Sequence, residues 1–163
     1  MYVCCRNVCR SLVAKAITSQ LMQFYRMNGY LIESAGTMDV GKERCDATMQ
    51  RIAAGYGYYY NDYSRYIRNV DISQYDLIIT MDYEQKLLVE SALPENSQTT
   101  VVLFNQICFG EDTPVEDYRS MPDASFRNIF AHIHQGCSLI VSQLREIEKG
   151  DKDWNTWIES CTE

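Results

Sequence analysis

Hydrophobic and polar positions along the chain follow two different spacings, one typical of helices and the other of buried strands. Apolar residues recur every three or four positions through residues 10–27 and 123–149, which predicts two long amphipathic helices. Continuous apolar runs at residues 77–81 and 101–104 predict strands that are buried on both faces. Weaker signals complete the prediction, and they indicate short strands at 2–3 and 30–32 and helices at 42–54 and 83–91.

Strands and helices alternate in this prediction, which favours a parallel sheet with right-handed crossovers and helices on both faces. We therefore predict a single-domain, three-layer α/β fold with a central four-stranded parallel sheet flanked by helices. The domain is expected to span residues 1–150, with a long loop at 105–121 and an acidic C-terminal tail at 151–163. Ligands of such folds bind at the carboxyl ends of the strands, and the first such end leads into residues 4–11.

The composition is typical of one globular domain and argues against several classes of function. Of the 163 residues, 46% are hydrophobic and 23% are charged, and the net charge is −7. Phosphate backbones repel so acidic a chain, so we predict no nucleic-acid partner. The chain has no run of 18 apolar residues, and Arg6 and Arg10 interrupt any apolar signal segment at its start. We therefore predict no membrane partner.

Seven cysteines are a large number for this length, and their spacing excludes two common uses. They stand at positions 4, 5, 9, 45, 108, 137 and 161. These positions form no paired C-x-x-C zinc motif, and a chain of this length folds without a disulfide scaffold. We therefore predict free thiols in a reducing compartment, the cytoplasm. His132 and His134 lie two positions apart and cannot share one helix face, so we predict no metal site there.

The segment after the first strand carries the chemistry. Cys4 is followed by five residues and then by Arg10, which opens a predicted helix and precedes Ser11. Successive backbone N–H groups and a helix N-terminus attract an anion, and a guanidinium grips two phosphate oxygens at once. In such a positive cradle Cys4 is expected to be a thiolate near neutral pH, and thus a nucleophile. The spacing alone is also compatible with a buried cysteine ahead of an ordinary helix.

Several stretches of the chain resemble the low-molecular-weight protein tyrosine phosphatase family. Residues 3–11 resemble the family's V-C-x-G-N-[IV]-C-R-S loop, and residues 34–37 resemble its S-A-G-T motif. Residues 71–82 resemble its D-F-x-x-F-D-x-I-x-x-M-D block, and Arg65 stands where the family often has an arginine. These matches span roughly residues 2–145 in the family's order, so together they are far more specific than the loop spacing alone.

The resemblance implies two-step hydrolysis of phosphotyrosine in proteins, with phosphate as the product and no metal or cofactor. Cys4 is then the nucleophile, Arg10 holds the phosphate oxygens, and Ser11 donates a hydrogen bond to the Cys4 sulfur. Ser34 is expected to brace the loop. The phosphate-binding cradle comprises Cys5, Arg6, Asn7, Val8, Cys9 and Ser11.

Cys9 has a second expected role, because it shares one short loop with the nucleophile. A partly exposed thiolate is the first to oxidise, and a neighbouring thiol then condenses with the sulfenic acid that forms. We therefore predict a reversible disulfide between Cys4 and Cys9 under mild peroxide. Adjacent cysteines bridge only with a strained peptide, so Cys5 is the weaker partner.

The family's general acid lies in a D-P-Y-Y loop, and this chain has no D-P pair. Asp117 stands nine residues before Phe126, the same separation as in the family pattern, so we predict Asp117 as the acid. The alternative is Asp123, which follows Pro122 and is also suited to cap the last helix.

The chain departs from the family pattern at the loop and at the acid. Arg6 replaces a glycine, Leu12 replaces a proline, and residues 117–120 replace D-P-Y-Y. These changes leave open an inactive phosphate-binding module on the same fold. Arsenate reductases need further cysteines near the third strand, and residues 77–107 contain none. Protein-arginine phosphatases resemble C-x-G-N-T-C-R-S, and the apolar Val8 in place of that threonine fits a tyrosine phosphatase better.

Overall fold

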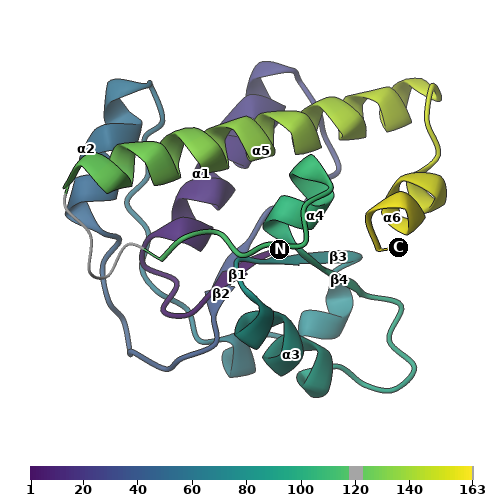
Figure 1. The fold of residues 1–163 in the computed structure, drawn as a ribbon, viewed down its shortest axis with the longest axis horizontal. Coiled ribbons are helices and arrows are strands. Elements are labelled where there is room, and N and C mark those ends of the chain that lie inside the picture. Colours follow the sequence, from purple (N-terminus) through teal and green to yellow (C-terminus); the bar gives the residue numbers. More distant parts are fainter. Residues whose placement is uncertain (118–122, 163) are drawn as a thin grey trace.

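The computed structural model describes residues 1–117 and 123–162 (Figure 1). Within these residues four parallel strands form one sheet, in the order β2-β1-β3-β4. The strands are β1 (Tyr2–Cys4), β2 (Ser34–Gly36), β3 (Leu77–Thr80) and β4 (Thr100–Leu103). Because β1 pairs with both β2 and β3, its carboxyl end opens at the middle of one edge of the sheet.

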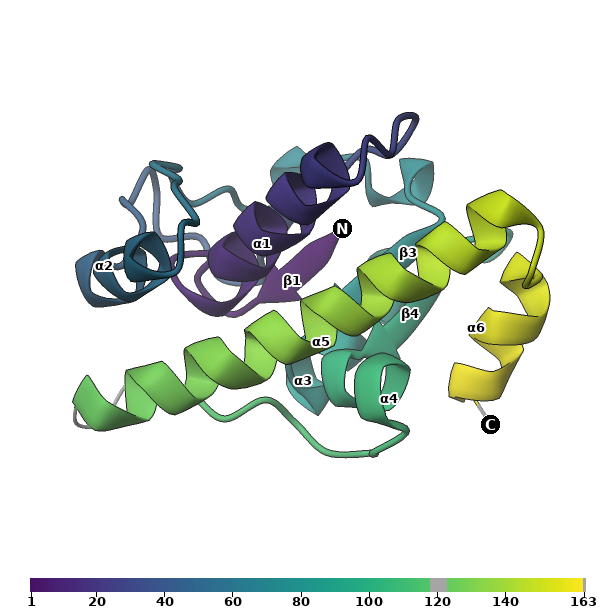
Figure 2. The same cartoon turned by 90° about the horizontal axis from the view of Figure 1, so that it is seen from above.

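Helices cover both faces of the sheet, which confirms the predicted three-layer α/β fold. In Figures 1 and 2, α1, α4 and α5 lie over one face and α3 lies under the other. The helices are α1 (Arg10–Phe24), α2 (Ala47–Gly55), α3 (Tyr83–Ala92), α4 (Phe104–Phe109), α5 (Asp123–Lys149) and α6 (Trp154–Thr162). Two short 3₁₀ turns, η1 (Ile67–Asn69) and η2 (Ile72–Gln74), precede β3. No helix in the described residues is long and apolar enough to cross a membrane.

The strands divide their side chains between two hydrophobic cores, as strands buried on both faces must. Tyr2 and Ile79 belong to the larger core, which also takes in residues from α1 and α5. Val3 and Ile78 belong to the smaller core, where Val89 of α3 covers them. The alternation fixes the direction of Cys4, which shares the face of Tyr2 and lies at the start of α1.

Two predictions about the elements are wrong. The second strand lies at Ser34–Gly36 and not at residues 30–32, because Ala35 pairs with Val3 while Leu31 remains 65% exposed. The predicted loop at 105–121 begins with helix α4, whose Phe104 is fully buried. Both predictions relied on hydrophobicity alone. Pairing with β1 decides which residues form the second strand, and packing under α5 decides which residues form α4.

Two helices begin or end at other residues than the sequence predicted. The second helix begins at Ala47 and not at residue 42, because the Asp46 carboxylate accepts a hydrogen bond from the Met49 N–H at 2.8 Å. The first helix ends at Phe24 and not at residue 27, because Arg26 adopts a left-handed backbone with φ 57°. Asp82 caps α3 through the Gln85 N–H at 2.9 Å, as its place in the sequence predicted.

The C-terminal residues form a packed helix. α6 begins at Trp154, and its Trp157 and Ile158 are buried in the larger core beside α4 and β4. The division between a domain at 1–150 and a tail at 151–163 stays a prediction, although nine of the tail residues are helical.

Candidate active site

The loop between β1 and α1 surrounds a small hollow at the carboxyl end of the sheet. Cys4 is the last residue of β1 and Arg10 is the first of α1, so the strand and the helix fix the two ends of the loop. The hollow is lined by Cys4, Cys5, Arg6, Val8, Cys9, Arg10 and Asp117. The structure therefore brings the predicted nucleophile, arginine and acid to one place, although more than 100 residues separate Cys4 from Asp117.

Asn7 and Ser11 lie behind the hollow and orient the cysteine. The Asn7 amide oxygen accepts a hydrogen bond from the Arg65 N–H at 2.9 Å, so its nitrogen points to Ser11 and donates to Oγ at 2.8 Å. Ser11 Oγ lies 2.9 Å from Cys4 Sγ. Because that oxygen already accepts from Asn7, its own hydrogen is free to donate to the sulfur. Such a donor stabilises a thiolate more than a thiol.

The loop holds this arrangement through an uncommon backbone conformation. Asn7 has φ 52°, in the left-handed region that asparagine tolerates better than most residues. It is also fully buried, so its polar atoms depend on the partners within the loop.

The end of β2 supports the loop from below. The N–H groups of Thr37 and Met38 donate to the carbonyl oxygens of Cys4 and Cys5 at 3.0 and 2.8 Å. A Cβ atom on Gly36 would lie 2.8 Å from the Cys5 carbonyl oxygen, so only glycine fits against the loop here. Sequence reasoning missed Gly36, although the S-A-G-T motif contains it. Ser34 lies buried at the start of β2, and its support of the loop stays a prediction.

Arg10 is held by three groups from two segments, Asp82 and residues 115–117. One guanidinium nitrogen donates to the Val115 carbonyl oxygen at 2.9 Å. The other lies 3.8 Å from Asp82 Oδ2 and 3.6 Å from Asp117 Oδ2. The Arg10 side chain is 3% exposed, so the guanidinium is fixed and its charge is poorly screened by solvent. Val115 and Asp82 are contacts of the site that sequence reasoning did not identify, because they come from distant loops.

The predicted acid, Asp117, contacts Arg10 and lies at the hollow, with its side chain one-third exposed. Residues 118–122, which include the positions that replace P-Y-Y of the family pattern, lie outside the described residues. The alternative, Asp123, is the first residue of α5, and its side chain is likewise not described.

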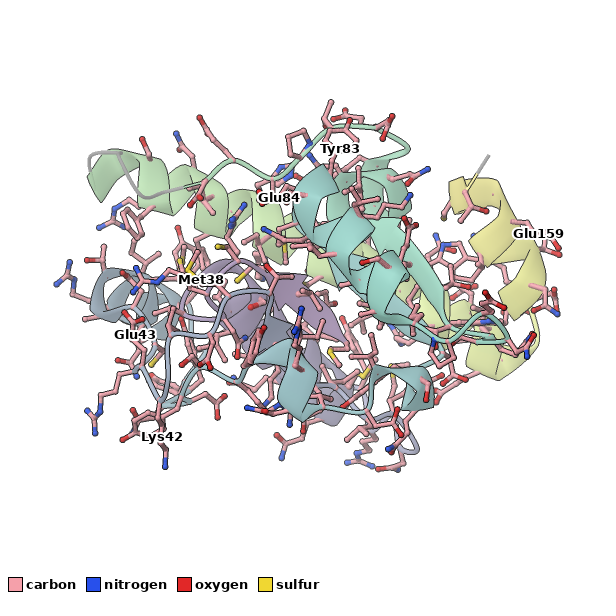
Figure 3. The ribbon with its side chains drawn as sticks, turned by 90° about the horizontal axis from the view of Figure 1, so that it is seen from below. Met38, Lys42, Glu43, Tyr83, Glu84 and Glu159 are labelled. Atoms are coloured by element: carbon pink, nitrogen blue, oxygen red, sulfur yellow. The ribbon has the colours of Figure 1, made fainter. Side chains whose placement is uncertain are left out.

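Arg6 forms an ion pair at the rim of the hollow. Its guanidinium donates to Glu43 Oε2 at 2.6 Å, and both side chains are 37% exposed. The Glu43 N–H donates to Ser64 Oγ at 2.8 Å, which steadies this part of the rim. Figure 3 views the molecule from this side, with Met38 and Glu43 beside the loop between β1 and α1 and Tyr83 on α3.

Cys9 and the other cysteines are free thiols. Cys9 immediately precedes α1, is 1% exposed, and burial raises the pKa of its thiol well above the usual value. It is therefore a neutral thiol near the hollow. The predicted Cys4–Cys9 disulfide stays a prediction.

The two histidines have structural partners away from the hollow. A ring nitrogen of His132 lies 2.6 Å from the Asn105 amide oxygen, and one of His134 lies 2.8 Å from the Tyr58 hydroxyl. Within the described part of the chain, no group of three or more histidine, cysteine or acidic residues is suited to hold a metal ion.

A cysteine at the end of a central parallel strand, a buried arginine beside it and a carboxyl group across the hollow define the class of cysteine-dependent phosphatases. The chain belongs to the low molecular weight phosphotyrosine protein phosphatase family, with a match over residues 1–150. Low molecular weight phosphotyrosine protein phosphatase 2 of Drosophila melanogaster is 24% identical over 149 residues, which are 89% of this chain and 91% of that protein.

Solved structures share the fold. A low molecular weight phosphotyrosine phosphatase from Vibrio cholerae superposes with a TM-score of 0.81 at 24% identity, covering 89% of this chain and 95% of that one. A Drosophila arginine phosphatase superposes with a TM-score of 0.75 at 25% identity, covering 88% of this chain and 95% of that one. The fold is therefore shared by enzymes named for two different phosphorylated residues.

Proposed function

We propose that this protein hydrolyses phosphotyrosine monoesters in phosphoproteins through a phosphocysteine intermediate. The observation that carries the proposal is the hydrogen-bonded chain from Asn7 through Ser11 to Cys4 in a hollow that also contains Arg10. These residues supply a stabilised thiolate and a fixed positive charge, the two requirements of phosphoryl transfer to cysteine.

In the first step the Cys4 thiolate attacks phosphorus in line with the bond to the tyrosine oxygen. The sulfur–phosphorus bond forms as that oxygen leaves, and Asp117 gives its proton to the departing phenolate. Arg10 and the loop amides bind the three remaining phosphate oxygens, where negative charge is spread in the transition state. The fixed Arg10 side chain needs little reorganisation to do so.

In the second step water attacks the phosphocysteine. Asp117, now a carboxylate, accepts a proton from that water, and the sulfur leaves as a thiolate. The Ser11 hydroxyl stabilises the leaving sulfur through the same 2.9 Å contact. The products are tyrosine and inorganic phosphate, and the enzyme returns to its starting state.

Phosphoarginine is the second candidate substrate, because an arginine phosphatase shares the fold. Val8 lines the hollow with an apolar side chain and offers no hydroxyl to a guanidinium. An aryl ring packs against such a side chain without leaving a polar group unpaired. Val8 therefore favours phosphotyrosine.

The proposal is tested with purified protein on p-nitrophenyl phosphate, a phosphotyrosine peptide and a phosphoarginine peptide. We expect hydrolysis of the first two and loss of turnover in Cys4→Ser, with the fold and phosphate binding retained. The matched control is Cys161→Ser, which removes a thiol from α6 and is expected to keep the wild-type rate. Retention of more than a few per cent of the rate by Cys4→Ser would exclude Cys4 as the nucleophile. Binding of phosphate without turnover by the wild type would support a phosphate-binding module.

A further inference from the structure

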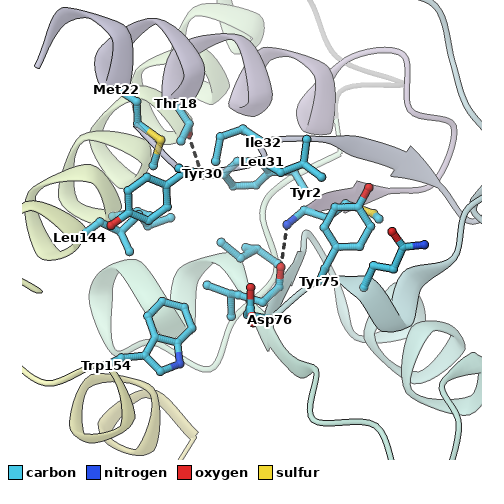
Figure 4. Close-up of a pocket in the computed structure, with 16 residues that line it drawn as sticks. Tyr2, Thr18, Met22, Tyr30, Leu31, Ile32, Tyr75, Asp76, Leu144 and Trp154 are labelled. Atoms are coloured by element: carbon cyan, nitrogen blue, oxygen red, sulfur yellow. Dashed lines mark hydrogen bonds between the residues drawn. The ribbon is translucent and has the colours of Figure 1, made fainter. Parts of the chain in front are cut away.

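A larger hollow, of about 440 Å³, lies at the other end of the sheet from Cys4. It opens where β1 and β3 begin, and residues 29–32 and 74–76 form two of its walls (Figure 4). Its volume lies within the range of cavities that hold small molecules. It shares no lining residue with the hollow beside Cys4, so the two are separate.

Four aromatic side chains from separate segments line this hollow: Tyr2, Tyr30, Tyr75 and Trp154. Figure 4 shows Tyr30 and Trp154 on one side and Tyr75 across from them, with Asp76 between Trp154 and Tyr75. The Tyr2 hydroxyl is engaged by Thr18 at 2.7 Å, which orients its ring at the back of the hollow. The hollow therefore has aromatic walls on several sides and a carboxylate at its edge.

The side chains that line the hollow carry a net negative charge. Of the described residues that line the hollow, Asp76 is the one acid and none is lysine or arginine. Arg65 reaches the Tyr75 hydroxyl at 3.5 Å and is itself paired with Glu33 at 3.5 Å.

We propose that this hollow binds a small organic cation that carries a trimethylammonium group. The faces of aromatic rings attract a cation, and a quaternary ammonium group has no N–H that would be left without an acceptor. Asp76 adds a full negative charge at the edge of the same hollow. An anion would be repelled by this carboxylate, and a wholly apolar ligand would gain no attraction from it.

The C-terminal helix contributes the tryptophan of this site. Trp154 is the first residue of α6, and α6 lies beyond the residues 1–150 that match the family. Burial of Trp157 and Ile158 holds the helix against the body of the protein. Trp154 is therefore presented by an ordered element, so the ring is positioned before a ligand arrives.

The test compares two ligands of the same shape that differ in charge. Choline and the neutral isostere 3,3-dimethylbutan-1-ol are titrated into the full chain by calorimetry at constant ionic strength. We expect saturable binding of choline, about tenfold tighter than that of the alcohol, as cation–π contacts in a partly desolvated site provide. Equal affinities for choline and the alcohol would show that the hollow is an apolar cavity without preference for a cation, which contradicts the proposal. Absence of saturable choline binding at concentrations on the order of 10 mM would also contradict it.

Variants locate the binding. Asp76→Asn and Trp154→Leu are each expected to weaken choline binding by about fivefold to tenfold and to leave the alcohol nearly unaffected. Glu159→Gln is the matched control, because it removes the same charge from an exposed position on α6 outside the hollow. If Glu159→Gln weakened choline binding as much as Asp76→Asn, the effect would be one of net charge, and the proposal would be wrong. Circular dichroism verifies that each variant is folded.

Discussion

Replacing Ser11 with alanine tests the hydroxyl that links the loop to Cys4, the proposed nucleophile. Ser11 is fully buried, and its Oγ lies 2.9 Å from Cys4 Sγ and 2.8 Å from Asn7 Nδ2. Ser11→Ala removes one atom, so Cys4 and Arg10 keep their places in the strand and the helix. The change therefore perturbs the state of the sulfur more than the shape of the hollow.

The two lost hydrogen bonds have different consequences. A hydrogen bond to a charged group contributes about 1.5–3 kcal/mol, so loss of the donor to the Cys4 thiolate is expected to lower the rate by about 10–150-fold. Asn7 Nδ2 loses its acceptor inside the protein, which is expected to reduce the free energy of unfolding by about 1–3 kcal/mol. One substitution is thus expected to change both catalysis and stability.

The assays are steady-state hydrolysis of p-nitrophenyl phosphate and urea unfolding. Ser138→Ala is the matched control, because its hydroxyl donates to the His134 carbonyl oxygen within α5, away from the loop. We expect that control to keep the wild-type rate. If Ser11→Ala hydrolysed the substrate within about twofold of wild type, the hydroxyl would not support the sulfur and the argument from the 2.9 Å contact would fail.

Three further changes test other parts of the structure. Asp117→Asn is expected to slow hydrolysis of phenyl phosphate by about 10²–10⁴-fold and of p-nitrophenyl phosphate by less. Asp123→Asn is expected to change either rate little. If steady-state kinetics showed the reverse order, Asp123 would be the acid. Mild peroxide is expected to form a disulfide between Cys4 and Cys9, so added thiols restore the activity of wild type but not that of Cys9→Ser. Full recovery of the variant's activity, or a Cys4–Cys5 disulfide found by peptide mapping, would show that Cys9 does not have this role. Trp157→Ala is expected to lower the free energy of unfolding by about 3–5 kcal/mol with little change in kcat, because Trp157 is a buried residue of α6 that is 8% exposed. A midpoint in urea equal to that of wild type would show that burial of Trp157 adds no stability.

The strong apolar runs predicted their elements well because burial on both sides leaves few alternatives. The run at 77–81 contains all of β3, the run at 101–104 contains three of the four residues of β4, and the long periodic pattern at 123–149 is α5. The 30–32 run failed because a strand of three residues is defined by its partner and not by its own hydrophobicity. Ala35 and Gly36 pair with β1, and Gly36 is small enough to lie against the loop between β1 and α1, whereas Leu31 is left exposed.

The sequence by itself determined which residues meet at the first loop. Cys4, Arg10 and Ser11 lie within eight residues, so the end of one strand and the start of one helix bring them together in any fold of this class. Tertiary structure alone decided the contacts to distant residues: Arg10 meets Val115, Asp82 and Asp117, and Gly36 supports the loop from β2. Local spacing constrains neighbours along the chain through the backbone, whereas residues 70–110 positions apart meet only after the sheet has aligned its strand ends at one edge.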